Sequence, residues 1–117
     1  MLSSYFLELR TGQDYASDAY DAAAQRMVNM LVSLLSDSQT INALTHDATR
    51  ESCHSDVEVM LEFNGTVREL VGKVVVDIRA DAACKFDKSK WTKLVKARPE
   101  ADEWKLLKIS KRAVPEV

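Results

Sequence analysis

The amino-acid sequence predicts an α+β fold, with N-terminal helices packed on a curved antiparallel sheet of about four strands. Three observations predict this class. Apolar side chains recur at spacings of three and four through residues 14–37, which is a helical pattern. After Asp56 the apolar period changes to two, which is typical of strands with one buried face. Asn64-Gly65, the strongest hairpin signal in the chain, then joins two strand-like stretches.

The composition is that of a folded globular protein. Its 117 residues suit one domain with a core, and 46% are hydrophobic and 29% charged. We therefore treat residues 1–117 as a single α+β domain, with residues 113–117 as a flexible tail. The sequence has no apolar run of membrane-spanning length, no signal-peptide pattern and only two cysteines. We expect a cytoplasmic protein with reduced thiols and no membrane partner.

The first ten residues, Met1–Arg10, fit two different elements. A helix would place Leu2, Tyr5, Phe6 and Leu9 on one face, whereas a strand would alternate Tyr5, Leu7 and Leu9. We expect the helix and keep the strand as the alternative, because the choice changes the topology.

The stretch Asp14–Asp37 predicts one long amphipathic helix that packs across the sheet. Asp14 is placed to accept a hydrogen bond from a free backbone N–H at its start. Its apolar stripe consists of Tyr20, Ala23, Ala24, Met27, Met30, Leu31, Leu34 and Leu35. Ser36 and Gln39 have capping-box spacing for a further helix, and the polar stretch Thr45–Asp56 is expected to be a loop.

The middle of the chain predicts a β-hairpin. Residues 56–63 alternate between apolar and polar, and Asn64-Gly65 suits a two-residue turn that needs positive φ. The return strand runs through residues 66–82. Its apolar phase changes near Gly72, which predicts a bulge or bend at that glycine.

The C-terminal stretch predicts a second hairpin. A strand containing Trp91 would turn at Pro99 and return through Trp104. A helix over Asp87–Ala97 is the alternative. If it is formed and Met1–Arg10 is a strand, the chain has the βαββαβ order of ferredoxin-like domains.

Two segments resemble nuclear transport factor-like (cystatin-like) domains. YFLELRTGQDYASDAY resembles the opening of that fold, and KWTKLVKARPEADEWKLLKIS resembles its closing hairpin. The resemblance implies a helix-backed, strongly curved sheet, frequently dimeric, that serves as a partner-binding module or a pocket enzyme. It carries over no catalytic residue, because no enzyme motif of that family matches.

The charges are distributed unevenly along the chain. Residues 1–84 carry six basic and thirteen acidic side chains, whereas residues 85–112 carry ten basic and four acidic ones. Such a basic segment is typical of a nucleic-acid face or of a protein interface. The acidic pI of about 5.7 favours the interface. The candidate interface residues are Trp91, Lys93, Trp104, Leu106 and Lys108.

Reactive residue types gather in one polar stretch, where His46-Asp47 precedes Cys53-His54. These residues lack the regular ligand spacing of a metal site, and we predict neither a metal, nor a cofactor, nor a catalytic residue. An acid/base site would combine His46 or Asp47 with a tyrosine hydroxyl. The candidate pocket or rim residues are Tyr15, Tyr20, His46 and Asp47.

These observations predict a non-catalytic binding or protein-interaction module that dimerises through its sheet. Two other functions stay open. One is a small pocket enzyme of the isomerase or hydrolase type, and the other is a single-stranded nucleic-acid binder acting through residues 85–112.

Overall fold

The computed structural model describes residues 1–16, 18–45, 48–85, 87–98 and 106–113. The elements are β1 (Leu2–Arg10), α1 (Tyr20–Ser36), α2 (Ser38–Thr45), β2 (Arg50–Asn64), β3 (Val67–Ala80), α3 (Lys88–Lys96) and β4 (Leu106–Arg112). The four strands form one antiparallel sheet in the order β2-β3-β1-β4. The predicted α+β class with an antiparallel sheet is confirmed.

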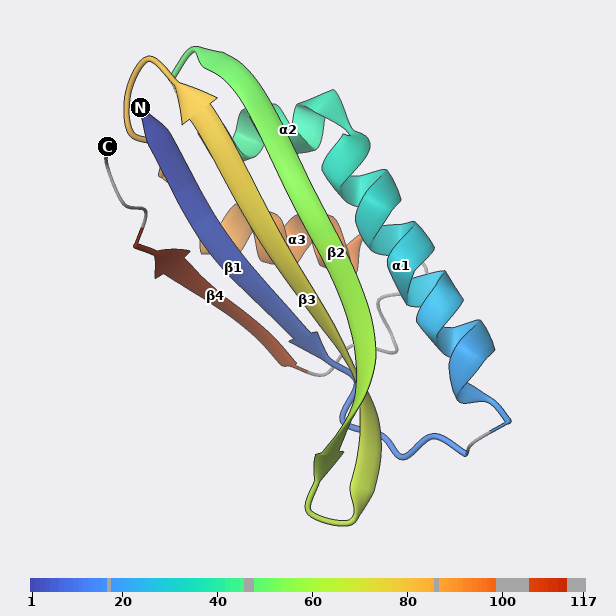
Figure 1. Cartoon of the computed structure of the whole chain (residues 1–117). Helices are drawn as coiled ribbons and strands as arrows, with labels where there is room; N and C mark the ends of the chain where they lie inside the picture. The colour runs from blue at the N-terminus through green and yellow to red at the C-terminus, as the bar shows by residue number, and fades with distance from the viewer. Residues whose placement is uncertain (17, 46–47, 86, 99–105, 114–117) are drawn as a thin grey trace.

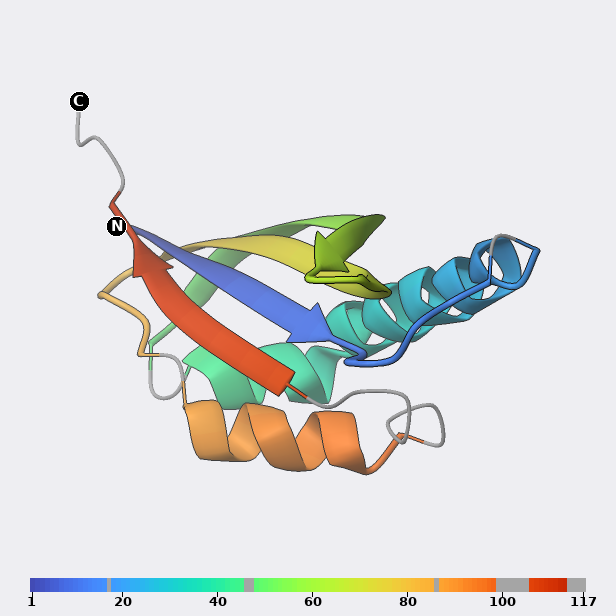
Figure 2. The same cartoon turned by 90° about the horizontal axis from the view of Figure 1, so that it is seen from below.

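The molecule has two layers, with α1, α2 and α3 all on one face of the sheet (Figures 1 and 2). The core lies between the layers, and its fully buried aliphatic side chains come from both. They include Leu7, Leu31, Val74, Val76 and Ile78, each with 0% exposure. Among the described residues, no helix lies over the opposite face of the sheet (Figure 2).

The expected helix over Met1–Arg10 is wrong, because Leu2–Arg10 form strand β1. β1 lies inside the sheet and pairs with β3 on one side and β4 on the other. Tyr5, Leu7 and Leu9 are buried, which is the alternation of the strand alternative. These distant pairings decide the conformation, since the local sequence fits both periods.

The expected strand around Trp91 is also wrong, because this segment forms helix α3. The carboxylate of Asp87 caps the helix by accepting a hydrogen bond from the backbone N–H of Lys90 at 3.1 Å. Trp91 and Val95, four residues apart, are buried against the core. Because β1 is a strand and α3 is a helix, the chain follows the βαββαβ order given as the alternative, with α2 as an extra helix.

The long N-terminal helix is shorter than expected, because α1 begins at Tyr20. The Asp14 carboxylate accepts a hydrogen bond from the backbone N–H of Arg68 at 2.8 Å, so it pairs with β3 and does not cap a helix. The backbone N–H of Tyr15 donates to the carbonyl of Arg68 at 3.0 Å. Most of the predicted apolar stripe is confirmed, with the buried residues Ala23, Met27, Met30, Leu31, Leu34 and Leu35.

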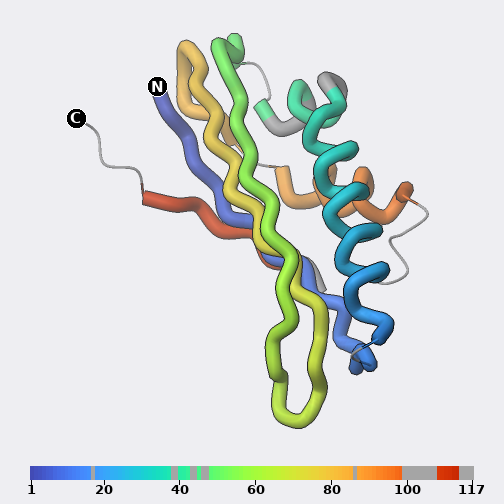
Figure 3. Tube along the Cα trace, turned by 45° about the vertical axis from the view of Figure 1, so that its right-hand side comes forward, coloured from blue at the N-terminus to red at the C-terminus, as the bar shows by residue number. Residues whose placement is uncertain are grey.

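The predicted central hairpin is confirmed, but its turn lies one residue later than expected. Asn64 pairs with Val67, so the loop consists of Gly65 and Thr66, and Gly65 has φ 64°. The hairpin end extends beyond the other strands (Figures 1 and 3).

Two further expectations about the hairpin strands are wrong. β2 begins at Arg50, so most of the expected Thr45–Asp56 loop is strand. The pairing of β3 runs unbroken through Gly72, opposite Leu9 and Val59, and the register shift lies instead between Arg50 and Ser52. No bulge is needed at Gly72 because both faces of this regular strand carry apolar residues: Leu70 and Val74 face the core, and Val71 and Val75 face the other side.

Candidate interaction surface

The face of the sheet opposite the helices is the candidate surface for a partner. In an antiparallel sheet, directly opposed residues project to the same side, and successive residues alternate. Because Leu7 and Val74 face the helices, the even-numbered residues of β1 and their opposed neighbours face away. We call this surface the uncovered face. It consists of Leu2, Ser4, Phe6, Glu8 and Arg10 of β1; Glu69, Val71, Lys73, Val75, Asp77 and Arg79 of β3; His54, Asp56, Glu58, Met60 and Glu62 of β2; and Lys108, Ser110 and Arg112 of β4.

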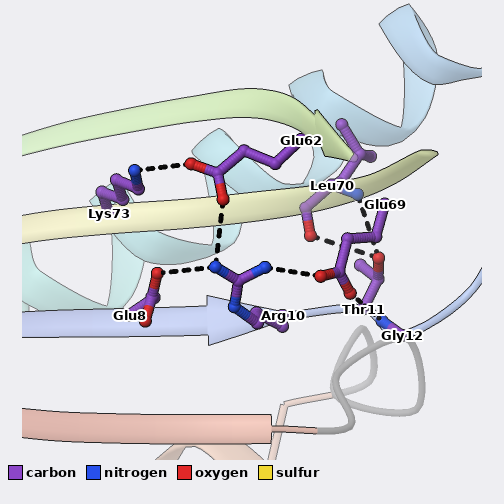
Figure 4. A network of polar contacts seen from close by, with 8 residues as sticks. All are labelled: Glu8, Arg10, Thr11, Gly12, Glu62, Glu69, Leu70 and Lys73. Carbon is purple, nitrogen blue, oxygen red and sulfur yellow. Dashed lines mark hydrogen bonds and ion pairs between the residues drawn. The ribbon is translucent and has the colours of Figure 1, made fainter. Parts of the chain in front are cut away.

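Arg10 is the centre of a charge network at one end of the uncovered face (Figure 4). Its Nη2 lies 3.1 Å from Glu8 Oε1 and 3.0 Å from Glu62 Oε2, and its Nη1 donates to Glu69 Oε1 at 2.5 Å. Lys73 Nζ extends the network by donating to Glu62 Oε1 at 2.6 Å. One guanidinium therefore joins carboxylates from three adjacent strands.

Glu69 is the most buried member of this network, with 1% of the residue exposed. Its second carboxylate oxygen accepts a hydrogen bond from the backbone N–H of Gly12 at 3.0 Å. A buried carboxylate needs such partners, because removing its water without replacement is costly. The Arg10–Glu69 contact thus connects the end of β1 to β3.

Three members of this network, Arg10, Lys73 and Glu62, have shifted pKa values. The hydrogen bond to Glu69 raises the pKa of Arg10 above its usual value. The hydrogen bond from Lys73 lowers the pKa of Glu62, and the same contact raises the pKa of Lys73. General acid/base work at neutral pH needs a group whose pKa lies near 7, so these three groups suit a structural role.

An apolar pair lies at the middle of the uncovered face. Phe6, at the centre of β1, lies directly opposite Val75 of β3, and both are half-buried. Leu2 of β1 and Met60 of β2 are also half-buried. This centre gives a partner apolar surface to bury.

The two edges of the uncovered face carry opposite charge. The exposed residues Asp56 and Glu58 make the β2 edge acidic, whereas the exposed residues Lys108 and Arg112 make the β4 edge basic. This separation arises because the acidic half of the sequence supplies β2 and the basic half supplies β4.

Two of the four predicted pocket or rim residues, Tyr15 and Tyr20, lie in the described part of the chain, and both pack against the core. Tyr15 is a buried core residue with 6% exposure, and Tyr20 packs half-buried against the same core. His46 and Asp47 lie outside the described residues.

The candidate interface residues do not share one surface. Trp91 is fully buried in the core beneath the sheet, because α3 turns it inward. Lys93 is exposed on α3, on the helix side of the sheet, whereas Lys108 is exposed on the uncovered face. Leu106 begins β4 opposite Arg10, and Trp104 lies outside the described residues.

An open depression of about 640 Å³ lies beside the start of β2. Its lining residues are Leu35, Ser36, Ile41, Arg50, Glu51, Ser52, Cys53, His54 and Ser55. Cys53 packs against the core, whereas the next residue, His54, projects to the uncovered face and lies 3.2 Å from Asp56. Burial raises the pKa of the Cys53 thiol, which disfavours the reactive thiolate. The depression therefore offers no Cys–His nucleophile pair.

The described residues contain no cluster of three or more His, Cys, Asp or Glu side chains placed to hold a metal ion. None of the helices in the described segments has the length and apolar character needed to cross a membrane.

Sequence reasoning did not predict the charge network, because the expected Asn64-Gly65 turn gives a hairpin register in which Glu62 and Glu69 are not opposed. In the structure, Glu62 and Glu69 lie directly opposite each other on β2 and β3. Opposed like charges are unfavourable and call for a nearby cation. The identity of that cation, Arg10, depends on β1 being the neighbouring strand.

Comparisons with protein-family models, with curated proteins and with solved structures find no significant match to this chain.

Proposed function

We propose that this chain is a non-catalytic protein-interaction module that self-associates through the uncovered face. The observation that carries the proposal is the distribution of side chains on that face. An apolar centre at Phe6 and Val75 lies between an acidic edge on β2 and a basic edge on β4. An apolar centre with a charged rim is the usual anatomy of a protein interface.

The described chemistry supports binding over catalysis. Arg10, Lys73 and Glu62 have pKa values displaced away from neutrality, so they keep their charges at the pH of most reactions. Burial raises the pKa of Cys53, the half-buried thiol beside the depression. Neither set of residues is poised to accept a proton or attack a substrate.

The structure divides the basic segment between two surfaces, which argues against a nucleic-acid site. The lysines of α3 are exposed on the helix side, whereas Lys108 and Arg112 lie on the uncovered face. Phe6 is the single Phe, Tyr or Trp among the described residues of the uncovered face. Single-stranded nucleic-acid sites combine a continuous basic groove with several stacking aromatics.

The test is the mass of the protein in solution, measured by light scattering over a range of protein and salt concentrations. We expect a dimer for the natural chain and a monomer for Phe6→Asp, because a carboxylate at the centre would be buried without a partner. Phe63→Asp is the matched control. Phe63 is 76% exposed at the hairpin end, and its side chain projects to the opposite side of β2 from Met60, which lies on the uncovered face. The Phe63→Asp variant should therefore stay dimeric.

Folding of the variants is checked by circular dichroism. If Phe6→Asp does not fold, the milder Val75→Ser tests the same centre and should weaken the dimer. A natural chain that is monomeric at every concentration would overturn the proposal. Binding of a labelled single-stranded oligonucleotide with a steep loss of affinity as salt rises would assign the surface to nucleic acid instead.

A further inference from the structure

One row of four opposed residues crosses the whole uncovered face. Lys108 of β4 pairs with Glu8 of β1, Glu8 pairs with Lys73 of β3, and Lys73 pairs with Glu58 of β2. From the β4 edge to the β2 edge the charges alternate as plus, minus, plus, minus. We call these four residues the charged row.

When the order of the charged row is reversed, every position carries the opposite charge. A twofold axis that runs parallel to the strands, between β1 and β3, places β4 over the partner's β2 and β1 over the partner's β3. Lys108 then faces the partner's Glu58, and Glu8 faces the partner's Lys73. All four positions of the row meet an opposite charge.

The neighbouring row of opposed residues is also complementary to itself under the same twofold axis. It contains Ser110, Phe6, Val75 and Asp56, in order from β4 to β2. The axis places Phe6 over the partner's Val75 and the Ser110 hydroxyl over the partner's Asp56 carboxylate. The apolar pair lies at the centre of the stack, and the polar pair lies at its edge.

Packed sheets lie about 10 Å apart, with strands crossing at about 30°, so the opposed rows match best near the centre. Phe6 is the middle residue of β1, and the charged row is the next one along the strand. Both rows therefore lie where two stacked sheets remain in register.

The alternative face-to-face arrangement is less favourable. A twofold axis across the strands, along the Phe6–Val75 row, would place β4 over the partner's β4. Lys108 would then face the partner's Arg112, a like-charge contact, and Lys73 would face the partner's Asp77, so repulsion and attraction offset each other. The charge pattern therefore distinguishes the two arrangements.

The outer charges are available for a partner. Glu58 and Lys108 are both exposed, and within the described part of the chain no salt bridge engages either side chain. Four strands of about nine residues span roughly 19 Å by 30 Å, or on the order of 600 Å² of flat area. Specific interfaces bury about 1,200–2,000 Å² over both partners, and two such faces together reach about 1,200 Å², the lower end of that range.

We infer that the partner of the uncovered face is a second copy of this chain, stacked about a twofold axis parallel to the strands. The two charged rows then lie in opposite order, so that each charge faces an opposite charge of the partner. This inference rests on the proposed function, self-association through the same face, and adds the arrangement that makes the association specific.

The test exchanges the two outer charges of the row. Glu58→Lys alone places two lysines opposite each other at both symmetric contacts, and Lys108→Glu alone places two carboxylates opposite each other. We expect each variant to raise the dimer dissociation constant by at least about tenfold at low salt, measured by sedimentation equilibrium. A mixture of the two variants should form a heterodimer, detected by native mass spectrometry, because both of its contacts are again opposite in charge.

Two further proteins serve as controls. The double variant Glu58→Lys/Lys108→Glu keeps its contacts complementary and should dimerise with itself. Lys93→Glu makes the same charge change on α3, on the helix side of the sheet, and should leave the dimer unchanged.

The outcomes separate the arrangement from the proposed function. A monomeric natural chain overturns both. A dimer that Phe6→Asp abolishes, but that the mixed variants do not re-form, leaves the sheet interface standing and overturns the arrangement. Preferential pairing of Glu58→Lys with the natural chain would place β2 over the partner's β2, which also overturns it.

Discussion

Arg10 Nη1 and Glu69 Oε1 are joined by a 2.5 Å hydrogen bond between β1 and β3, and Glu69 is 1% exposed. The guanidinium also contacts Glu8 and Glu62, so it neutralises a site where carboxylates outnumber cations. Without Arg10, the Glu69 carboxylate would lose its charged partner and keep the hydrogen bond from the Gly12 backbone N–H. The contact thus fixes the end of β1 to its neighbour.

Arg10→Leu should therefore destabilise the protein more than an ordinary surface substitution. Loss of one partner from a buried ion pair costs about 3–5 kcal/mol, and partial exposure of Arg10 lowers the expected cost to about 2–4 kcal/mol. Urea denaturation measures this free energy of unfolding.

The matched variant is Arg10→Leu/Glu69→Gln. Its neutral amide can still accept from Gly12 and leaves no unpaired buried charge, so it should recover part of the lost stability. A double variant that is less stable than Arg10→Leu would contradict the assignment of the cost to the unpaired carboxylate.

Glu62 predicts a pH dependence of stability. The hydrogen bond from Lys73 lowers the pKa of Glu62 in the folded chain. The folded state therefore binds the proton more weakly than the unfolded state. The stabilisation is complete above the ordinary pKa of about 4.5 and is lost as the pH falls through the lower folded value.

Glu62→Gln, which cannot titrate, should lack this contribution. We expect the stability difference between the natural chain and the variant to be constant near neutrality and to shrink below about pH 4.5. Denaturation at one fixed protein concentration measures it, because dimerisation would otherwise contribute. A difference that stays the same down to about pH 3 would show that Glu62 has an ordinary pKa.

The sequence predicted the elements whose local pattern has one interpretation. The stripe through Met27 and Leu34 fits a helix alone, and the alternation through Val57 and Val59 fits a strand alone. Each pattern is long enough to exclude the other period.

The two elements whose type was predicted wrongly, β1 and α3, are short, and their apolar residues fit both a helix and a strand. β1 became a strand because β3 and β4 pair with it, and these partners come about 60 or more residues later in the chain. α3 became a helix because it buries Trp91 against the core and has an Asp87 cap. No local window contains the β1 pairings, which also explains why the Arg10 network could not be predicted.

Leu31 and Val32 give a direct test of the α1 packing. Leu31 has 0% exposure in the core, whereas the next residue, Val32, is 48% exposed. Leu31→Ala should cost about 2–5 kcal/mol, because it removes buried methyl groups and leaves a cavity. Val32→Ala should change stability by less than about 0.5 kcal/mol. Equal thermal melts for the two variants would contradict the orientation of α1.

The two thiols test the view that the depression beside β2 is not a nucleophilic site. Burial raises the pKa of both Cys53 and Cys84 above the usual thiol value. At a given pH a raised pKa lowers the fraction of thiolate, which is the reactive form. Both cysteines should therefore react with a disulfide reagent more slowly in the folded protein than in denaturant, with rates that rise as the pH increases.

Single variants assign the rates to each position. The Cys53→Ser variant gives the reaction rate of Cys84, and the Cys84→Ser variant gives the reaction rate of Cys53. We expect Cys53, which is half-buried, to react faster than Cys84, which is 3% exposed. Rapid labelling of Cys53 at neutral pH, faster than in denaturant, would instead indicate an activated thiolate beside His54 and favour a pocket enzyme.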